Sequence, residues 1–371
     1  MQTILLAANE RHRFGALLPA TPMPLAPIAN RPLIAMALDM LARAGSGAVR
    51  LLLCHDAAPI ADYVDEGRRW GLSVRPVHLP APLGDVGTLR FAAAGLEDTL
   101  LVLPADAILD LEIEEALAFH RAHGGLATAI VRLAPPRPDD DLLCVDRNGG
   151  VTAASSAAGV VTHTGAYMLE PAVLDVLAAS GSGDPGLIQA LLAAGVPLVV
   201  YPLRGYWNPL RTLNDLHEAQ QVVLYSAFAG AQPGQAPAAR VRFPALEGRQ
   251  IAPGVWAGDH HAVHPSARLV APLCIGAGAW VARAAELGPG VVCGPRTLVD
   301  TGAVIRYSTI VGQTYIGRQV QIDSRIVSGE MVAHPATGEI IRVEHPRVIG
   351  RVGAAQSLRL LRQQPAEREP G

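Results

Sequence analysis

The sequence predicts an α/β, Rossmann-like domain followed by a parallel β-helix. Two observations predict this pair of folds. Up to about Ser226, short apolar strands alternate with helical patterns, and from Ile251 an aliphatic residue recurs at every sixth position. Alternation of strands and helices is typical of a mainly parallel sheet covered on both faces. A period of six with turn-forming glycines is typical of hexapeptide β-helices.

The elements of the first part can be read in order. We expect strands at Val49–Cys54, Leu100–Leu103, Ala127–Val131 and Leu198–Tyr201, and helices at Leu33–Arg43, Ile113–His123, Ala172–Ala178 and Leu213–Leu224. A stretch rich in small residues and proline then separates the halves. The expected domains are therefore residues 1–226, a linker at 227–250, a repeat domain at 251–350, and a tail at 351–371 that is helical briefly and then frays.

The repeat is long and regular. Its inward positions are expected to be Ile251, Ala257, Val263, Leu269, Ile275, Val281, Leu287, Cys293, Val299, Ile305 and Val311, after which a slip of one residue precedes Ile316 and Ile322. Glycine often follows, at Gly258, Gly276, Gly288, Gly294 and Gly312. The outward positions are often apolar, and Trp280 is the largest of them. Since a contiguous apolar face usually marks a protein contact, we expect self-association or binding of a paralogue through residues 251–327.

Composition excludes several classes. A net charge of -3 and a pI near 6.5 argue against a nucleic-acid surface. No apolar run approaches the roughly 18 residues of a membrane helix, and no signal-like start is visible, so the expected location is cytoplasmic. The four cysteines lack metal or redox spacing and read as reduced thiols. The chain contains no lysine, so all 30 of its Lys+Arg residues are arginine.

Several motifs up to residue 225 resemble those of the sugar-1-phosphate nucleotidylyltransferases. "LAANERHRFGALL", "PMPL" and "ANRPLI" lie without a gap over the family's L-A-A-G-x-G-T-R-L, P-K-P-L and P-L-I. "PLGDVGTLRFA", "LVLPADAILD", "TGAYMLEPAVLDVL" and "GYWNPLRTLNDLHEA" follow in the family's order. The resemblance implies a Rossmann-like nucleotidyltransferase (GT-A-like) domain, and in this family a left-handed hexapeptide β-helix often follows it.

The phosphate-binding motif departs from the family at its chemical positions. Among its nucleotide-binding residues Ala8, Asn9 and Arg11, the last two replace glycines that let the backbone approach the phosphates. The motif arginine is kept as Arg13, and Met23 stands where the family has a lysine. Arg31 occupies the place of a second lysine, which an arginine does not simply replace.

The metal position is also altered. The resemblance makes Asp106 one acidic ligand, while its partner falls on Pro209, which has no carboxylate. The neighbouring Asn208 would face the opposite side of a strand. Because Mg²⁺ prefers octahedral oxygen ligation, often with one or two carboxylates, we expect at most weak binding of Mg²⁺ and no other cofactor.

The binding positions are better kept. Gly84 and Gly87 match the turn that lies against the nucleotide base in the family, with Asp85 in place of the usual threonine, and Gly165 and Tyr167 match the sugar-side strand. Simple turn chemistry explains the glycines equally well. His12 and Asp139–Asp141 are interpreted as solvated loop residues. His260, His261 and His264 would suit a hexapeptide acyltransferase, although a surface role is the simpler interpretation.

Three functions follow from these observations. The first is a catalytically impaired family member that binds a nucleotide or NDP-sugar, or a catalytic paralogue, and regulates supply of glycan or polysaccharide precursors. The second is an active NDP-sugar pyrophosphorylase in which Arg11, Arg13 and Arg31 replace the missing lysine. The third is a hexapeptide acyltransferase.

Overall fold

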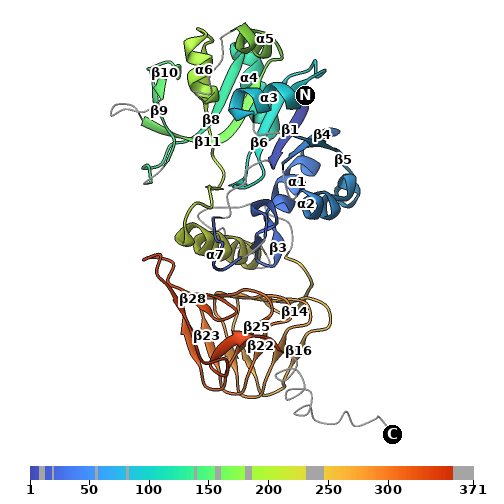
Figure 1. Ribbon diagram of the computed structural model, residues 1–371, viewed down its shortest axis with the longest axis vertical. Helices are drawn as coiled ribbons and strands as arrows, with labels where there is room; N and C mark the ends of the chain where they lie inside the picture. The colour runs from blue at the N-terminus through green and yellow to red at the C-terminus, as the bar shows by residue number, and fades with distance from the viewer. Residues whose placement is uncertain are drawn as a thin grey trace. The chain divides into compact units, whose positions relative to one another are not determined.

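The chain forms two compact units. Unit 1 comprises Met1–Arg11, Pro22–Leu25 and Leu33–Pro209, and unit 2 comprises His12–Thr21, Ala26–Pro32 and Leu210–Gly371. The computed structural model describes residues 1–7, 13–18, 21–54, 57–80, 83–137, 140–154, 160–179, 186–230 and 246–353. Figure 1 shows the elements. Among the described residues, no helix combines the length and apolarity needed to cross a membrane.

Unit 1 is built on a nine-stranded sheet. Its central path is β10-β9-β11-β6-β1-β4-β5, with β8 pairing with β11 and with β12. The strands are β1 (Gln2–Ala7), β4 (Ala48–Leu53), β5 (Ser73–His78), β6 (Leu100–Pro104), β8 (Ala127–Arg132), β9 (Leu142–Val145), β10 (Val151–Ala154), β11 (Val160–Leu169) and β12 (Leu198–Pro202). The pairs β5-β4-β1-β6 and β8-β12 are parallel, whereas β11 runs antiparallel to both β6 and β8.

Helices cover both faces of this sheet. They are α1 (Leu33–Arg43), α2 (Ala58–Val64), α3 (Gly84–Ala93), α4 (Ile113–His123), α5 (Ala172–Ala179) and α6 (Leu187–Ala193), with 3₁₀ turns η1 (Met23–Leu25) and η2 (Asp65–Trp70). Neighbouring strand residues enter different cores. Leu5 packs in the cluster of α1, α2 and α4, and Ile4 in the cluster of α3, α5 and α6. This alternation is the two-residue period of a strand, and it confirms the two covered faces. The expectation of a mainly parallel sheet was wrong, because β11 runs antiparallel to β6, β8 and β9 and makes the sheet mixed.

Unit 2 contains three sheets of short parallel strands, drawn from ochre to red in Figure 1. The first contains β15 (Val255–Ala257), β18 (Leu273–Ile275), β21 (Val291–Cys293), β24 (Thr309–Ile310) and β27 (Ile326–Ser328). The second contains β16 (Ala262–Val263), β19 (Trp280–Val281), β22 (Leu298–Val299) and β25 (Thr314–Ile316), and the third β17 (Arg268–Leu269), β20 (Glu286–Leu287), β23 (Val304–Arg306) and β26 (Gln321–Asp323). Antiparallel strands β14 (Arg249–Ala252), β28 (Met331–Ala333), β29 (Ile340–Arg342) and β30 (Ile349–Arg351) border the sheets.

The register of these strands follows the repeat. Leu273 pairs with Val255 and Val291, each eighteen positions away, or three hexads. Strands that recur every three hexads in three sheets are compatible with a β-helix. Gly258 shows why small residues follow the inward positions, because a Cβ there would lie 2.6 Å from the Ala277 amide nitrogen of the next layer.

Two inward positions of the repeat were predicted wrongly. Ile251 is 37% exposed because β14 pairs antiparallel with β15 at the border of the sheet. Cys293 pairs with Ile310, only seventeen positions away. The slip of one residue therefore comes before β24, the strand of Ile310, and not after it. Ile310 therefore occupies the buried position in place of Val311.

Early chain segments complete unit 2. The hairpin β2 (Pro27–Ile28) to β3 (Arg31–Pro32) turns through Ala29 and Asn30, whose φ angles are 47° and 67°. Gln220 of α7 (Leu213–Gly230) accepts a hydrogen bond from the Ala29 amide at 2.6 Å and donates to the Pro27 carbonyl at 2.7 Å. Asn30 Nδ2 donates to the Cys293 carbonyl at 3.0 Å.

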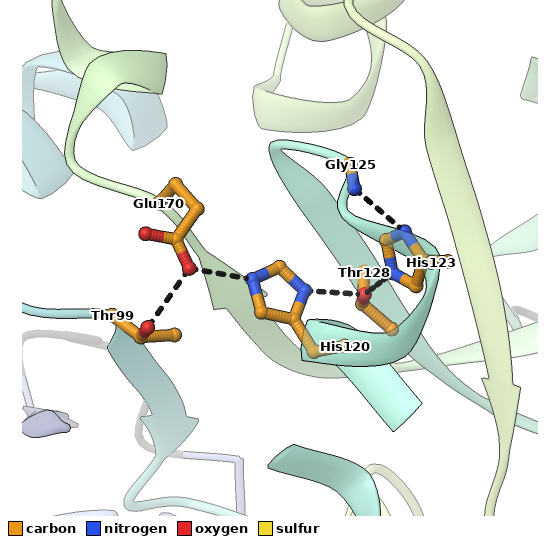
Figure 2. A network of polar contacts seen from close by, with 6 residues as sticks. All are labelled: Thr99, His120, His123, Gly125, Thr128 and Glu170. Atoms are coloured by element: carbon orange, nitrogen blue, oxygen red, sulfur yellow. Dashed lines mark hydrogen bonds and ion pairs between the residues drawn. The ribbon is translucent and has the colours of Figure 1, made fainter. Parts of the chain in front are cut away.

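A polar network occupies the other edge of the unit 1 sheet, where β6 and β8 begin (Figure 2). His120 Nδ1 lies 2.7 Å from Thr128 Oγ1, and His120 Nε2 lies 3.1 Å from Glu170 Oε1. Thr128 Oγ1 also lies 2.7 Å from His123 Nε2, and the Gly125 amide donates to His123 Nδ1 at 2.9 Å. Thr99 Oγ1 donates to Glu170 at 2.8 Å. The network connects β6, α4, β8 and the end of β11.

Candidate functional site

Predicted site residues of unit 1 meet at the carboxyl edge of the parallel strands. Strand β6 ends at Pro104, and Asp106 follows at 7% exposure. The antiparallel strand β11 carries Gly165 past Pro104, where a Cβ on the glycine would lie 3.4 Å from Pro104 Cγ. Gly165 has a φ of +85°, a conformation that favours glycine. The structure thus brings Asp106 and Gly165 to one edge of the sheet, where α/β folds commonly bind ligands.

Tyr167 lies deeper on the same strand. Its ring centroid is 4.5 Å from that of His163, and its side chain is buried. Burial, and then the negative charges of Asp85 and Asp141, raise the pKa of the Tyr167 phenol above its ordinary value. The phenol therefore stays protonated and can donate a hydrogen bond.

The nucleotide turn itself begins α3. Gly84 has a φ of +68°, and a Cβ on Gly87 would lie 2.9 Å from Leu83 Cβ. Both glycines therefore have a backbone or packing reason to be glycine, and their role in binding stays a prediction.

A short ribbon presents the second half of the metal motif. Strand β13 (Trp207–Asn208) pairs antiparallel with β7 (Ile108–Leu109), which comes two residues after Asp106. Trp207 Nε1 donates to the Thr164 carbonyl at 3.2 Å, and Asn208 Nδ2 donates to Tyr206 Oη at 2.9 Å. Pro209 follows directly. The strand that carries the motif is formed at this edge. The residue directly after it, where the family has a carboxylate, is a proline.

The lysine position of the phosphate motif and its two arginine positions belong to different units. Met23 belongs to unit 1 and is 4% exposed, while Arg13 and Arg31 belong to unit 2. Ala8, Asn9 and Arg11, together with His12 and Asp139, lie outside the described residues.

Arg132 is a site candidate that the sequence analysis missed. It is the last residue of β8, and its guanidinium carbon lies 6.0 Å from the centre of the Trp207 ring. The signal in the sequence was a single charge ending the apolar strand "ATAIV". An arginine at a strand end is common, so the pattern alone did not distinguish it.

The remaining candidates make local contacts. His261 Nδ1 donates to the Gly258 carbonyl at 2.7 Å, His264 Nδ1 lies 2.9 Å from Ser266 Oγ, and His260 is exposed. Asp140 accepts from the Arg137 amide at 2.9 Å and from Thr162 Oγ1 at 3.2 Å. Within the described ranges, no three His, Cys, Asp or Glu side chains are grouped so that they could hold a metal ion.

Comparisons with known proteins agree with the fold of unit 1. A family profile described as "Nucleotidyl transferase" matches residues 2–226. The chain is 25% identical to a UTP–glucose-1-phosphate uridylyltransferase of Synechocystis over 93% of this chain and 91% of that protein. It is 22% identical to mannose-1-phosphate guanylyltransferase 1 of Arabidopsis thaliana over 94% of this chain and 91% of that protein.

A similar structure comes from Bacillus anthracis. It is named as a glucose-1-phosphate thymidylyltransferase in complex with a sucrose, and it matches with a TM-score of 0.54 and 17% identity over 60% of this chain and 94% of that one. This likeness shows the fold. With the profile match, it defines a nucleotidyltransferase-type α/β protein. The chain belongs to the sugar-1-phosphate nucleotidylyltransferase family.

Proposed function

We propose that the chain binds a nucleotide or NDP-sugar, has lost most turnover, and serves as a regulatory subunit in the synthesis of glycan or polysaccharide precursors. The observation that carries this proposal is Pro209, which follows β13 at the position of the second metal-binding carboxylate. A proline ring offers no oxygen ligand from its side chain. The buried Met23 at the lysine position supports the same conclusion.

The family reaction makes these losses serious. A sugar-1-phosphate oxygen attacks the α-phosphate of a nucleoside triphosphate in line, and pyrophosphate leaves. Such phosphoryl chemistry depends on alignment and on neutralising charge. A thioether at Met23 is uncharged and cannot neutralise a phosphate. Removing one electrostatic donor typically costs about 10²–10³ in rate, and losing two that serve one transition state costs on the order of 10⁴ or more, without being additive.

The residues at the edge fit Mg²⁺ poorly. Asp106 supplies one carboxylate, Pro209 supplies none, and the Asn208 amide donates to Tyr206. Magnesium prefers six oxygen ligands in near-octahedral geometry. We therefore derive no catalytic step through a metal in this chain, and we expect binding of Mg²⁺ to be weak.

We also propose that unit 2 is a left-handed β-helix that mediates assembly, either with a second copy or with a catalytic paralogue. The three-hexad register supports the β-helix, and the outward column Ala262, Trp280, Leu298 and Tyr315 supports a contact surface. Within this column Leu298 and Tyr315 are buried, and the partly buried Trp280 and Val352 pack against them, so Trp280 is the member available for a contact.

Turnover is the first test. The purified chain with Mg²⁺, each nucleoside triphosphate and the common hexose-1-phosphates should release pyrophosphate only at a trace rate, because both altered positions act on the same phosphates. Thermal-shift and calorimetric titrations should show binding of a nucleotide or NDP-sugar by the same preparation. A turnover of about 1 s⁻¹ or more, within the ordinary enzyme range, would instead establish the active-enzyme alternative.

Restoring the two positions is a second test. Met23→Lys combined with Pro209→Asp should raise the rate or the affinity for Mg²⁺ by more than the two single changes together, because the groups are coupled through one reaction. Met23→Leu and Pro209→Ala are matched controls, since they change the same positions without adding charge. Equal rates for the restored and control pairs would show that these positions do not limit catalysis.

A further inference from the structure

Arg132 differs from the other arginines of unit 1 for which contacts are described. Arg43 lies 3.8 Å from Asp110, Arg204 lies 3.6 Å from Glu115, and Arg50 donates to two backbone carbonyls. Arg132 Nη1 is excluded from solvent and has no hydrogen-bond partner among the described residues. A buried charged donor that bonds neither to water nor to an acceptor costs free energy. Binding of an anion to this guanidinium would recover that free energy.

The surroundings keep the side chain at the carboxyl edge. Arg132 and Ile130 lie on the same face of β8 because strand side chains alternate, and Ile130 packs in one core cluster with Trp207. The Trp207 ring is fixed by its hydrogen bond to the Thr164 carbonyl. The guanidinium carbon lies 6.0 Å from that ring, at the outer limit of a cation–π contact. The ring therefore lies near Arg132 without neutralising its charge.

The same edge carries Asp106 and Gly165, described above. On β11, Thr162 is the direct partner of Arg132, three residues before Gly165. The predicted sugar strand thus runs beside the guanidinium. Because the chain contains no lysine and Met23 is uncharged, arginine is the side chain left to bind a phosphate tightly in this unit.

We propose that Arg132 binds the phosphate of a sugar-1-phosphate, taking over in part the charge that the lysine position lacks. The proposal rests on the proposed function, since it needs a site for sugar nucleotides at this edge. A guanidinium presents paired N–H donors that match two phosphate oxygens. The expected ligand is a hexose carrying a phosphate on its anomeric carbon, and the uncharged hexose should not be recognised by this residue.

The test compares charged and uncharged ligands. Dissociation constants for glucose-1-phosphate, mannose-1-phosphate, inorganic phosphate and glucose are measured by calorimetry on the full chain and on Arg132→Gln and Arg132→Lys. Arg132→Gln should weaken sugar-1-phosphate binding by about 10-fold or more, as expected for losing a charge-assisted contact. Arg132→Lys should weaken it less, because the charge remains. Arg204→Gln, which removes an exposed arginine of the same unit, should leave the constants unchanged.

The outcomes separate this inference from the function on which it rests. Equal affinities of the wild type and Arg132→Gln for a sugar-1-phosphate overturn the role of Arg132. So does a wild type that binds an NDP-sugar but no sugar-1-phosphate, although the proposed function then stands. A wild type that binds no nucleotide, NDP-sugar or sugar-1-phosphate removes both. A purely structural role would lower the melting temperature of Arg132→Gln and leave the preference for the phosphorylated sugar unchanged.

Discussion

His123 shows how one residue can make the stability of unit 1 depend on pH. The Gly125 amide can only donate, so His123 Nδ1 must accept and carry no proton. His123 Nε2–H then donates to Thr128 Oγ1, whose hydroxyl donates to His120 Nδ1, and His120 Nε2–H donates to Glu170. The sequence of donors and acceptors is complete when both histidines are neutral. Protonating His123 Nδ1 would set two N–H groups against each other.

This geometry predicts a loss of stability in acid. Burial, and then the charge of neighbouring His120, lower the pKa of His123 below its ordinary value of 6.5. The unfolded chain then binds more protons than the folded chain below that pH. The contribution of neutral His123 to the free energy of unfolding should be complete above pH 6.5. It should be lost as the pH falls below 6.5 toward and through the lowered pKa. Urea unfolding of the wild type and His123→Gln between pH 7.5 and pH 5 measures the effect.

The comparison isolates one histidine among several. His123→Gln keeps an oxygen that can accept from Gly125 but does not titrate, so its stability should depend less on pH. Identical pH dependence of the two proteins would show that His123 is not responsible. The exposed His260 provides the control, because His260→Gln should preserve the wild-type pH dependence.

Among single residues, the sequence identifies candidate site residues only where they fall within a recognisable motif. Met23 and Pro209 stand out in the sequence because they interrupt motifs with a fixed spacing, and their roles stay predictions. Arg132 does not stand out, because its distinction is an unmatched donor beside Trp207, a residue 75 positions later that only folding brings near. Glu170 and His120 are likewise 50 positions apart.

The hairpin β2–β3 is held by one glutamine of α7. Gln220 bonds to both the Ala29 amide and the Pro27 carbonyl, and Ala29 and Gln220 are buried. Gln220→Ala should lower the free energy of unfolding by about 1–3 kcal/mol, because it leaves buried backbone groups without partners. Chemical denaturation of the full chain measures this change.

The next residue on the same helix is a matched control. Gln221 Nε2 donates to the Gly290 carbonyl at 3.0 Å and does not bond to the hairpin, and its side chain is partly exposed. Gln221→Ala should therefore cost less than Gln220→Ala. Equal losses for the two variants would contradict a specific role of Gln220 in holding the hairpin.

Elements with a long pattern were predictable, and short ones were not. The helices Leu33–Arg43 and Ile113–His123 have the predicted bounds because each carries an apolar face over several turns. The strands β2 and β3 contain two residues each and leave no period to read. The slip before Ile310 was misplaced because Ile310 and Val311 are adjacent aliphatic residues, and either one continues a hydrophobic pattern.

At the scale of the whole molecule, assembly is the open prediction. Light scattering on the full chain at tens of micromolar should give a mass above the 38.8 kDa of one chain, or a catalytic paralogue should co-purify. Trp280→Arg should reduce the assembled fraction, because it places a charge on the outward apolar column. Leu133→Arg, at a residue of unit 1 that is 67% exposed, is the control. A monomer with no partner would end the assembly proposal.

Point variants suit this test better than a truncated chain. A chain ending at Ser226 would deprive Asn30 of the Cys293 carbonyl and the Leu17 carbonyl of its bond from Ser328 Oγ. Loss of assembly would then be mixed with disturbance of the early segments. Their membership of unit 2 was not visible in the sequence, because it depends on hydrogen bonds that span 263 and 311 positions.

The hydrogen bond between Asn30 and Cys293 also sets a waiting time during synthesis. The two residues are separated by 263 positions, and ribosomes add about 5–20 residues per second. Asn30 is therefore added to the growing chain roughly 13–50 s before Cys293, which carries its acceptor. During that interval most of unit 1 has been made, while the hairpin that precedes α1 still lacks the strand it binds. Unit 2 can close only after its last strands have been made, although some of its residues precede α1 in the chain.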